Sequence, residues 1–313
     1  LSLAQSPVVP DQYRRLLELI TEANADGVAI TGQCAPRPVG ILLGLDLTLN
    51  PFMNTAVWKR VRSLPLAEKV AALRDREVRT ELIADGTAER DREKLAGGLV
   101  TKFERLFEIG STPDYEPSPD DSIEARARRA GVAPAELALD LLLADDGQGM
   151  LYLPFLNYVD GGLEGTREML GHPYTVPGLG DGGAHVGTIC DGSFPTTLLT
   201  HWGRDRPVGR FPLEYLVQQQ ARDTARTVGL LDRGVVAPGY RADLNVIDFA
   251  GLGVRRPEIV HDLPAGGRRL LQRADGYLHT ICAGVETYAS GESTAELPGR
   301  LVRGAQRTPG GMT

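Results

Sequence analysis

Over residues 1–232, stretches with helical spacing of apolar side chains alternate with short, continuous apolar runs. Residues 13–24 have the spacing of an amphipathic helix, and the apolar run at 28–31 follows directly as a predicted buried strand. Buried strands are also predicted at 150–156 and 174–179. Further helices are predicted at 134–143, 166–170, 194–202 and 213–230. Helices that alternate with buried strands predict an α/β fold.

The pattern changes near residue 233, where helical spacing gives way to strand-like segments. A turn-linked pair of strands is predicted at 234–240 and 242–247, and another strand at 277–285 around the turn Ala283-Gly284. We therefore predict a domain of mixed helices and strands followed by a small, all-β domain, with the boundaries 1–232 and 233–313.

A long charged segment with helical character lies within the first predicted domain, near residues 59–135. Loops of this length between regular elements are often functional, so one interpretation is a lid over an active site. The alternative is a solvated helical insertion with no part in catalysis.

Composition narrows the classes of partner. The 313 residues carry 34 Lys and Arg against 41 Asp and Glu, a formal net charge of −7, which argues against nucleic-acid binding. No run of about 18 apolar residues predicts a membrane span. The sparse cysteines, Cys34, Cys190 and Cys282, fit a reducing compartment better than a disulfide scaffold, so we predict a cytoplasmic protein.

The most informative segment for chemistry is Gly178-Leu179-Gly180-Asp181-Gly182-Gly183-Ala184-His185-Val186. It places a carboxylate among glycines directly after a predicted strand, at the strand end where α/β folds carry function. An aspartate in this place can hold a metal ion and take a proton from an attacking water. Asp181 is therefore the candidate catalytic and metal-binding residue, although Asp-Gly-Gly is also a common turn sequence.

Four further residues are candidates for substrate binding. Gln33 and Arg37 follow a predicted strand, so they are expected at the same edge as Asp181, where Arg37 could clamp a carboxylate. Arg37 could equally hold a neighbouring loop. His185 either contacts substrate or is a polar loop residue, and His201 either reaches the pocket or packs at a helix end.

Several motifs in the expected order make the chain resemble the D-aminoacylase (N-acyl-D-amino-acid deacylase) branch of the metal-dependent amidohydrolases. They are the Asp181 segment, Pro238-Gly239-Tyr240-Arg241-Ala242-Asp243-Leu244, His261-Asp262-Leu263-Pro264-Ala265-Gly266-Gly267 and Pro298-Gly299-Arg300-Leu301-Val302-Arg303-Gly304. The resemblance implies the C-terminal part of a TIM-like (β/α) barrel followed by a small β-sandwich unit. It also implies a zinc enzyme that hydrolyses small N-acyl-D-amino acids, with Asp181 as metal ligand and general base.

The sequence departs from this family in two places. Gly180 stands where many relatives have Ser, and none of the five histidines forms the His-x-His pair from which these enzymes take metal ligands. Since one Asp cannot hold zinc, the simplest account is a fragment that lacks the N-terminal half of the barrel. Such a half-barrel would expose a strand edge and is expected to self-associate. The alternatives are a cyclic-amide or other amidohydrolase, and a non-catalytic truncated or degenerate domain.

Overall fold

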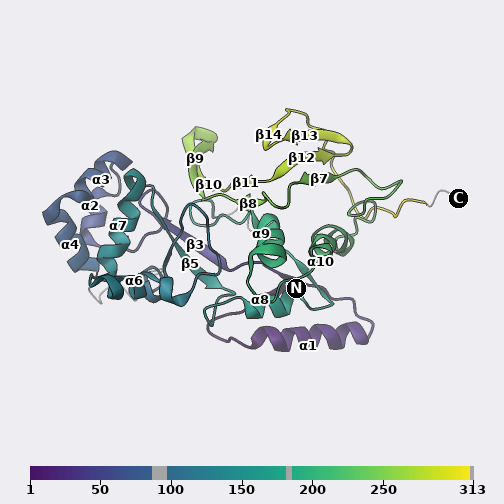
Figure 1. Ribbon diagram of the computed structural model, residues 1–313, viewed down its shortest axis with the longest axis horizontal. Helices are drawn as coiled ribbons and strands as arrows, with labels where there is room; N and C mark the ends of the chain where they lie inside the picture. Colours follow the sequence, from purple (N-terminus) through teal and green to yellow (C-terminus); the bar gives the residue numbers. More distant parts are fainter. Residues whose placement is uncertain (87–96, 181–184, 311–313) are drawn as a thin grey trace.

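The computed structural model describes residues 1–86, 97–180 and 185–310 (Figure 1). Three short strands, β1 (Ser2–Leu3), β2 (Gly32–Cys34) and β6 (Thr175–Pro177), run parallel in the order β1-β2-β6. Between β1 and β2 the chain forms α1 (Gln12–Ala25), and α8 (Glu164–Leu170) precedes β6. These strand–helix connections are those of a parallel α/β sheet.

One apolar core holds the parallel sheet and its helices together. Helix α1 buries Tyr13, Leu17 and Ile20, which follow the helical repeat predicted for this segment, and they pack with Leu3 and Trp202 in the same cluster. The core therefore joins the sheet to the helices that follow β6, where the candidate site lies.

The long connection from β2 to β6 contains a second sheet and most of the helices. Strands β3 (Val39–Gly44), β5 (Met150–Leu156) and β4 (Phe107–Glu108) are antiparallel, in the order β3-β5-β4. Around them lie α2 (Ala56–Val61), α3 (Leu66–Arg74), α4 (Arg76–Gly86), α5 (Gly97–Val100), α6 (Ile123–Ala130) and α7 (Pro134–Gly147), with single 3-10 turns at Phe103–Arg105 and Pro119–Asp121.

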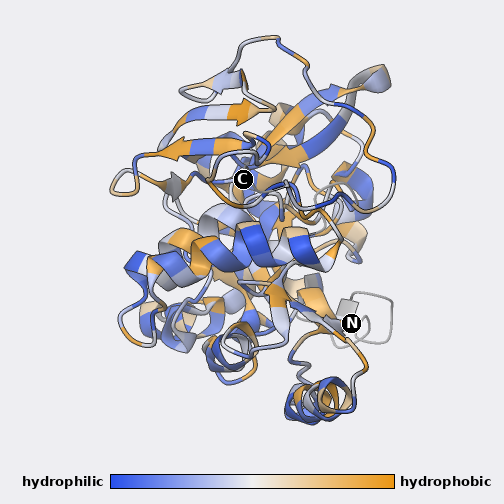
Figure 2. Cartoon of the chain, turned by 90° about the vertical axis from the view of Figure 1, so that its right-hand side faces the viewer, coloured by the Kyte–Doolittle hydropathy of each residue, from blue (hydrophilic) through white to orange (hydrophobic). Residues whose placement is uncertain are grey.

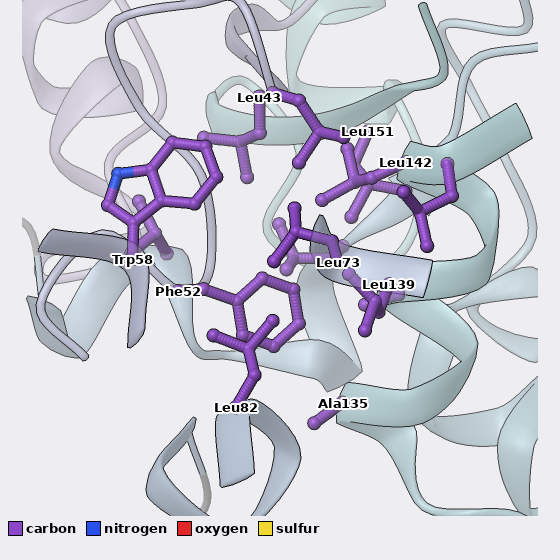
Figure 3. Packing of buried hydrophobic residues seen from close by; sticks show 14 of the residues in the cluster. Leu43, Phe52, Trp58, Leu73, Leu82, Ala135, Leu139, Leu142 and Leu151 are labelled. Atoms are coloured by element: carbon purple, nitrogen blue, oxygen red, sulfur yellow. The ribbon is translucent and has the colours of Figure 1, made fainter. Parts of the chain in front are cut away.

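The residues of this connection form a core of their own, which we call the insertion core. Figure 3 shows Phe52, Trp58 and Leu82 turned toward Leu139 and Leu151, and all five are nearly inaccessible to solvent. Because the cluster draws its members only from residues between 43 and 153, the connection is a packed unit in its own right.

The chain beyond β6 is helical first and then all strands. The helices are α9 (Phe194–Thr200), a π-helical turn η4 (His201–Asp205), α10 (Leu213–Gln218), a second π-helical turn η5 (Gln219–Asp223) and α11 (Thr224–Thr227). The strands are β7 (Leu244–Ile247), β8 (Gly253–Val254), β9 (Glu258–Leu263), β10 (Gly267–Leu271), β11 (Ala274–Asp275), β12 (Tyr277–Cys282), β13 (Val285–Ala289) and β14 (Glu292–Ser293), with a 3-10 turn at Pro264–Gly266.

These strands form three small antiparallel sheets, of which the largest has the order β14-β13-β12-β7. The other two are the pairs β10-β9 and β11-β8. Figure 2 shows hydrophobic and hydrophilic residues interleaved along the helices and the strands. Such interleaving is typical of elements that bury one side only.

The predicted mixed α/β class is confirmed, with corrections to individual strands. The strand predicted at 28–31 begins only at Gly32, because pairing with β1 and β6 starts there, and Val28 is exposed. No strand occupies 234–240, where the chain forms turns. The strand at 150–156 was predicted at its observed bounds but lies in the antiparallel sheet, outside the parallel one.

The barrel, the β-sandwich and the boundary between 232 and 233 stay predictions. The helices of the described chain include none that is long and apolar enough to cross a membrane.

Candidate active site

The carboxyl ends of β2 and β6 meet at one edge of the parallel sheet. Cys34 is in register with Pro177, and the Gly178 amide donates to the Cys34 carbonyl at 2.8 Å. The residues that follow both strands are therefore close together, which is the arrangement in which α/β sheets place ligand sites. Asp181, the predicted catalytic residue and metal ligand, follows Gly180 and lies outside the described residues.

A cavity of about 370 Å³ opens beside this edge. Its walls come from the ends of β2 and β6, the segment before α9, α9 itself and the helices near residue 220. The lining residues are Pro36, Pro177, Gly178, Gly180, Asp191, Gly192, Phe194, Pro195, Leu198, Gln220 and Thr224. We call this cavity the edge pocket.

Arg37 is buried beneath the edge pocket and binds the segment that leads into α9. Its guanidinium donates to the Cys190 carbonyl at 2.6 Å, to Ser193 Oγ at 3.0 Å and to Thr197 Oγ1 at 3.3 Å. It also lies 3.7 Å from a carboxylate oxygen of Asp191. Both charged side chains are almost completely buried, and charges in a protein interior must be paired, as these two are.

Two aromatic rings and one amide complete the surroundings of Arg37. The guanidinium carbon lies 3.7 Å from the centre of the Tyr115 ring and 4.7 Å from that of Phe194. Gln272, from the strand-rich part of the chain, contacts Arg37 Nη1 at 3.4 Å and accepts a hydrogen bond from Ser193. These contacts are those of the alternative role, in which Arg37 holds a neighbouring loop; a clamp on substrate stays a prediction.

The remaining polar candidates lie at different places. Gln33 is on β2, and its side chain packs beside Gly178, where an added Cβ would lie 3.3 Å from it. His185 is exposed, has a left-handed backbone (φ 53°), and its carbonyl accepts from the Thr188 amide at 2.7 Å. The next residues are tied to the core, since Val186 accepts from the Leu270 amide at 2.8 Å.

His201 faces a different cavity. Phe194 and Leu198 of α9 line the edge pocket, whereas Thr197, Thr200 and His201 line a second cavity of about 720 Å³. The structure therefore places His201 at the second cavity and outside the lining of the edge pocket, so its proposed role toward substrate at the edge pocket has no support in this placement.

A partly buried carboxylate, Glu116, lines the second cavity. It accepts from His201 Nε2 at 2.8 Å, from Arg206 Nε at 2.9 Å and from the Leu163 amide at 2.8 Å. Burial alone would raise the pKa of Glu116, but these hydrogen bonds outweigh it and lower the pKa to about 2. His201 is thus hydrogen-bonded to a carboxylate that also pairs with Arg206.

Sequence reasoning did not find Glu116, Asp191, Ser193 or Gln272. The only local signal was the position of Asp191 and Ser193, close after the glycine-rich segment. Within the described parts of the chain, no group of three or more His, Cys, Asp or Glu side chains could hold a metal ion. The residues that the structure describes therefore do not fit the predicted zinc ion.

Comparison with known proteins identifies the family. The sequence profile of the amidohydrolase family matches residues 10–288. The chain belongs to the amidohydrolase family. The resemblance seen in the sequence motifs is thus confirmed at this level, and amidohydrolases hydrolyse bonds between carbon and nitrogen.

Solved structures similar to this amidohydrolase include a D-aminoacylase, with 20% identity, 90% of this chain and 44% of that chain covered, and a TM-score of 0.43. Another is an N-acyl-D-glutamate deacylase from Bordetella bronchiseptica, in complex with zinc and a phosphonate inhibitor, with 18% identity, 94% and 48% covered, and a TM-score of 0.42. The chain spans less than half the length of either protein. No curated protein sequence matches the chain.

Proposed function

We propose that the chain is part of a metal-dependent amidohydrolase that hydrolyses the amide bond of N-acyl-D-amino acids. The membership of residues 10–288 in the amidohydrolase family carries this proposal. It is supported by Gly178 and Gly180, which follow β6 and line the edge pocket, and after which Asp181 comes in the sequence.

Asp181 has the central role in this proposal. Its carboxylate takes a proton from the attacking water and returns it to the leaving amine, as general bases do in amide hydrolysis. Gln33 and His185 contact substrate, and Arg37 sets the loop from Cys190 to Ser193 that borders the pocket. Residues outside the described parts supply the remaining metal ligands.

A second candidate function is a non-catalytic domain derived from an amidohydrolase. The absence of a metal-ligand cluster from the described parts of the chain favours it. Such a domain would keep the fold and the edge pocket but would neither bind metal nor hydrolyse amides.

Hydrolysis and metal content test the two candidates together. The substrates are N-acetyl-D-leucine, its L enantiomer and a cyclic amide, and the proteins are this chain and a version extended upstream, each with and without Asp181→Asn. Asp160→Asn, an exposed loop aspartate, is the matched control. We expect the version extended upstream to bind metal and to hydrolyse the D substrate. Asp181→Asn should abolish both properties, and the control variant Asp160→Asn should retain them.

The other outcomes separate the alternatives. Hydrolysis of the cyclic amide alone would show a different amidohydrolase. Hydrolysis that survives Asp181→Asn would refute the role of Asp181. No metal and no turnover in either protein would leave the non-catalytic domain as the function.

A further inference from the structure

The edge pocket has an unusual distribution of charge for a site that takes an amino-acid derivative. Its described lining includes one ionisable side chain, Asp191, which is paired with buried Arg37 at 3.7 Å. Lys, Arg and His are absent from that lining. Arg37 itself is buried against the Tyr115 and Phe194 rings and does not line the pocket.

The walls of the pocket are apolar because of how α9 begins. Phe194 and Leu198 are one helical turn apart, so both side chains lie on the same face of α9. Pro36 and Pro177, which follow or end the neighbouring strands, also line the pocket. Neither proline has a backbone N–H, so these positions offer a ligand no backbone donor.

The far side of the pocket is formed by Gln220 and Thr224, at the second π-helical turn and the start of α11. π-Helical turns are frequent at functional sites. The Thr224 hydroxyl donates to the Gln220 carbonyl at 2.6 Å, within its own helix. This side therefore presents an uncharged amide and a hydroxyl that already has an acceptor.

A pocket of about 370 Å³ is at the small end of the range for ligand sites. Apolar groups gain free energy on entering such a pocket because they leave water. A carboxylate would lose its hydration, and the described lining holds no cation to replace it. The lining therefore selects against acidic groups.

We infer that the edge pocket binds an uncharged aliphatic group of the substrate and excludes an acidic one. This inference rests on the proposed function, in which the substrate is an N-acyl-D-amino acid. The aliphatic group is either the N-acyl chain or the side chain of the amino acid, since the lining suits both.

Binding to this chain, measured by calorimetry and ligand-observed NMR, tests the inference without requiring turnover. Two pairs of probes separate the two sources of the aliphatic group: N-hexanoyl-D-alanine against N-glutaryl-D-alanine, and N-acetyl-D-leucine against N-acetyl-D-glutamate. We expect at least about ten-fold tighter binding of the aliphatic member in one pair, and that pair identifies the group in the pocket.

Thr224→Lys provides the decisive variant, because it places a cation in the pocket and removes hydrogen bonds only within the helix. It should weaken binding of the aliphatic probe about ten-fold and strengthen binding of the acidic one. Thr227→Lys is the matched control: Thr227 is exposed on the same short helix, and its hydroxyl also donates within the helix, at 2.8 Å to Asp223. Circular dichroism checks that both variants fold.

Three results would overturn the inference: no binding of any probe, equal affinity for aliphatic and acidic probes, or the same effect from Thr224→Lys and Thr227→Lys. The proposed function fails separately. If the aliphatic probe binds in a manner sensitive to Thr224→Lys but no amide is hydrolysed by the extended protein, the pocket is correctly assigned and the reaction is not. If the extended protein hydrolyses aliphatic and acidic substrates equally well, the reaction is correctly assigned and the pocket is not.

Discussion

Replacing Arg37 by methionine tests whether the buried cation holds the loop beside the edge pocket. Methionine keeps an unbranched apolar side chain but removes the guanidinium. The carbonyl of Cys190 and the hydroxyls of Ser193 and Thr197 then lose their donor, and Asp191 loses its neighbouring cation. Because Arg37 and Asp191 are only 3% and 4% exposed, water cannot easily take the place of the lost partner.

The expected loss in the free energy of unfolding follows from this burial. Removing one member of a buried ion pair typically destabilises a protein by about 3–5 kcal/mol, because the remaining charge stays buried without compensation. With a urea m-value of about 3 kcal/mol/M, the unfolding midpoint should fall by roughly 1 M or more. The double variant Arg37→Met/Asp191→Asn should cost less than the sum of the single changes, since it leaves no uncompensated charge.

Urea unfolding followed by tryptophan fluorescence measures these differences, since Trp202 is buried beside this region and donates to the Pro36 carbonyl. Arg60→Met is the control: Arg60 forms an exposed ion pair with Glu81, so its loss should change the midpoint far less. A loss below about 1 kcal/mol for Arg37→Met, or strictly additive effects in the double variant, would refute the argument that Arg37 and Asp191 act as a buried pair.

Two further predictions concern stability. The pKa of Glu116 is about 2 in the folded protein against an ordinary 4.5, so this group stabilises the fold above about pH 4.5, and its contribution is lost as the pH falls toward 2. Glu116→Gln should therefore flatten the decline of the urea midpoint between pH 5 and 2.5; an unchanged slope would contradict this. Gly276→Ala should lower the melting temperature more than Gly284→Ala: both glycines have left-handed backbones, but only at Gly276 would a Cβ meet backbone, 2.6 Å from Leu252. The clash should lower the free energy of unfolding, measured by calorimetry, by about 1–3 kcal/mol. Equal melting temperatures for the two variants would show that the backbone at Gly276 can move.

Local patterns in the sequence predicted where individual strands lie better than they predicted which strands pair with each other. The run at 150–156 is buried over most of its length, so its strand could be recognised from composition alone. Its partner β3 was missed because Gly40 and Gly44 interrupt the apolar run. Gly40 is nonetheless what allows the pairing, since a Cβ there would lie 2.1 Å from the Tyr152 ring.

The candidate site shows the same limit. The sequence placed Arg37 and Asp181 after strands and at the same edge, and the parallel pairing of β2 and β6 agrees with that placement for the described residues. The partners of Arg37 lie 153 to 235 positions away along the chain, and no local pattern relates residues so distant. The link between His201 and Glu116, 85 positions apart, was hidden for the same reason.

The long connection between β2 and β6 has a consequence for how the chain folds. Cys34 and Val176 come together across 142 positions, and closing so long a loop of flexible chain costs entropy before any contact forms. The insertion core lies entirely within this interval, and its helices α2 and α3 both contact α4, which is close to them in sequence. Since local contacts form faster than distant ones, the insertion core should form first, and the antiparallel pairing of Gly44 with Met150 then brings the ends of the interval near each other. The parallel sheet, and with it the edge pocket, should therefore form after the insertion core, a core that lies outside the sheet.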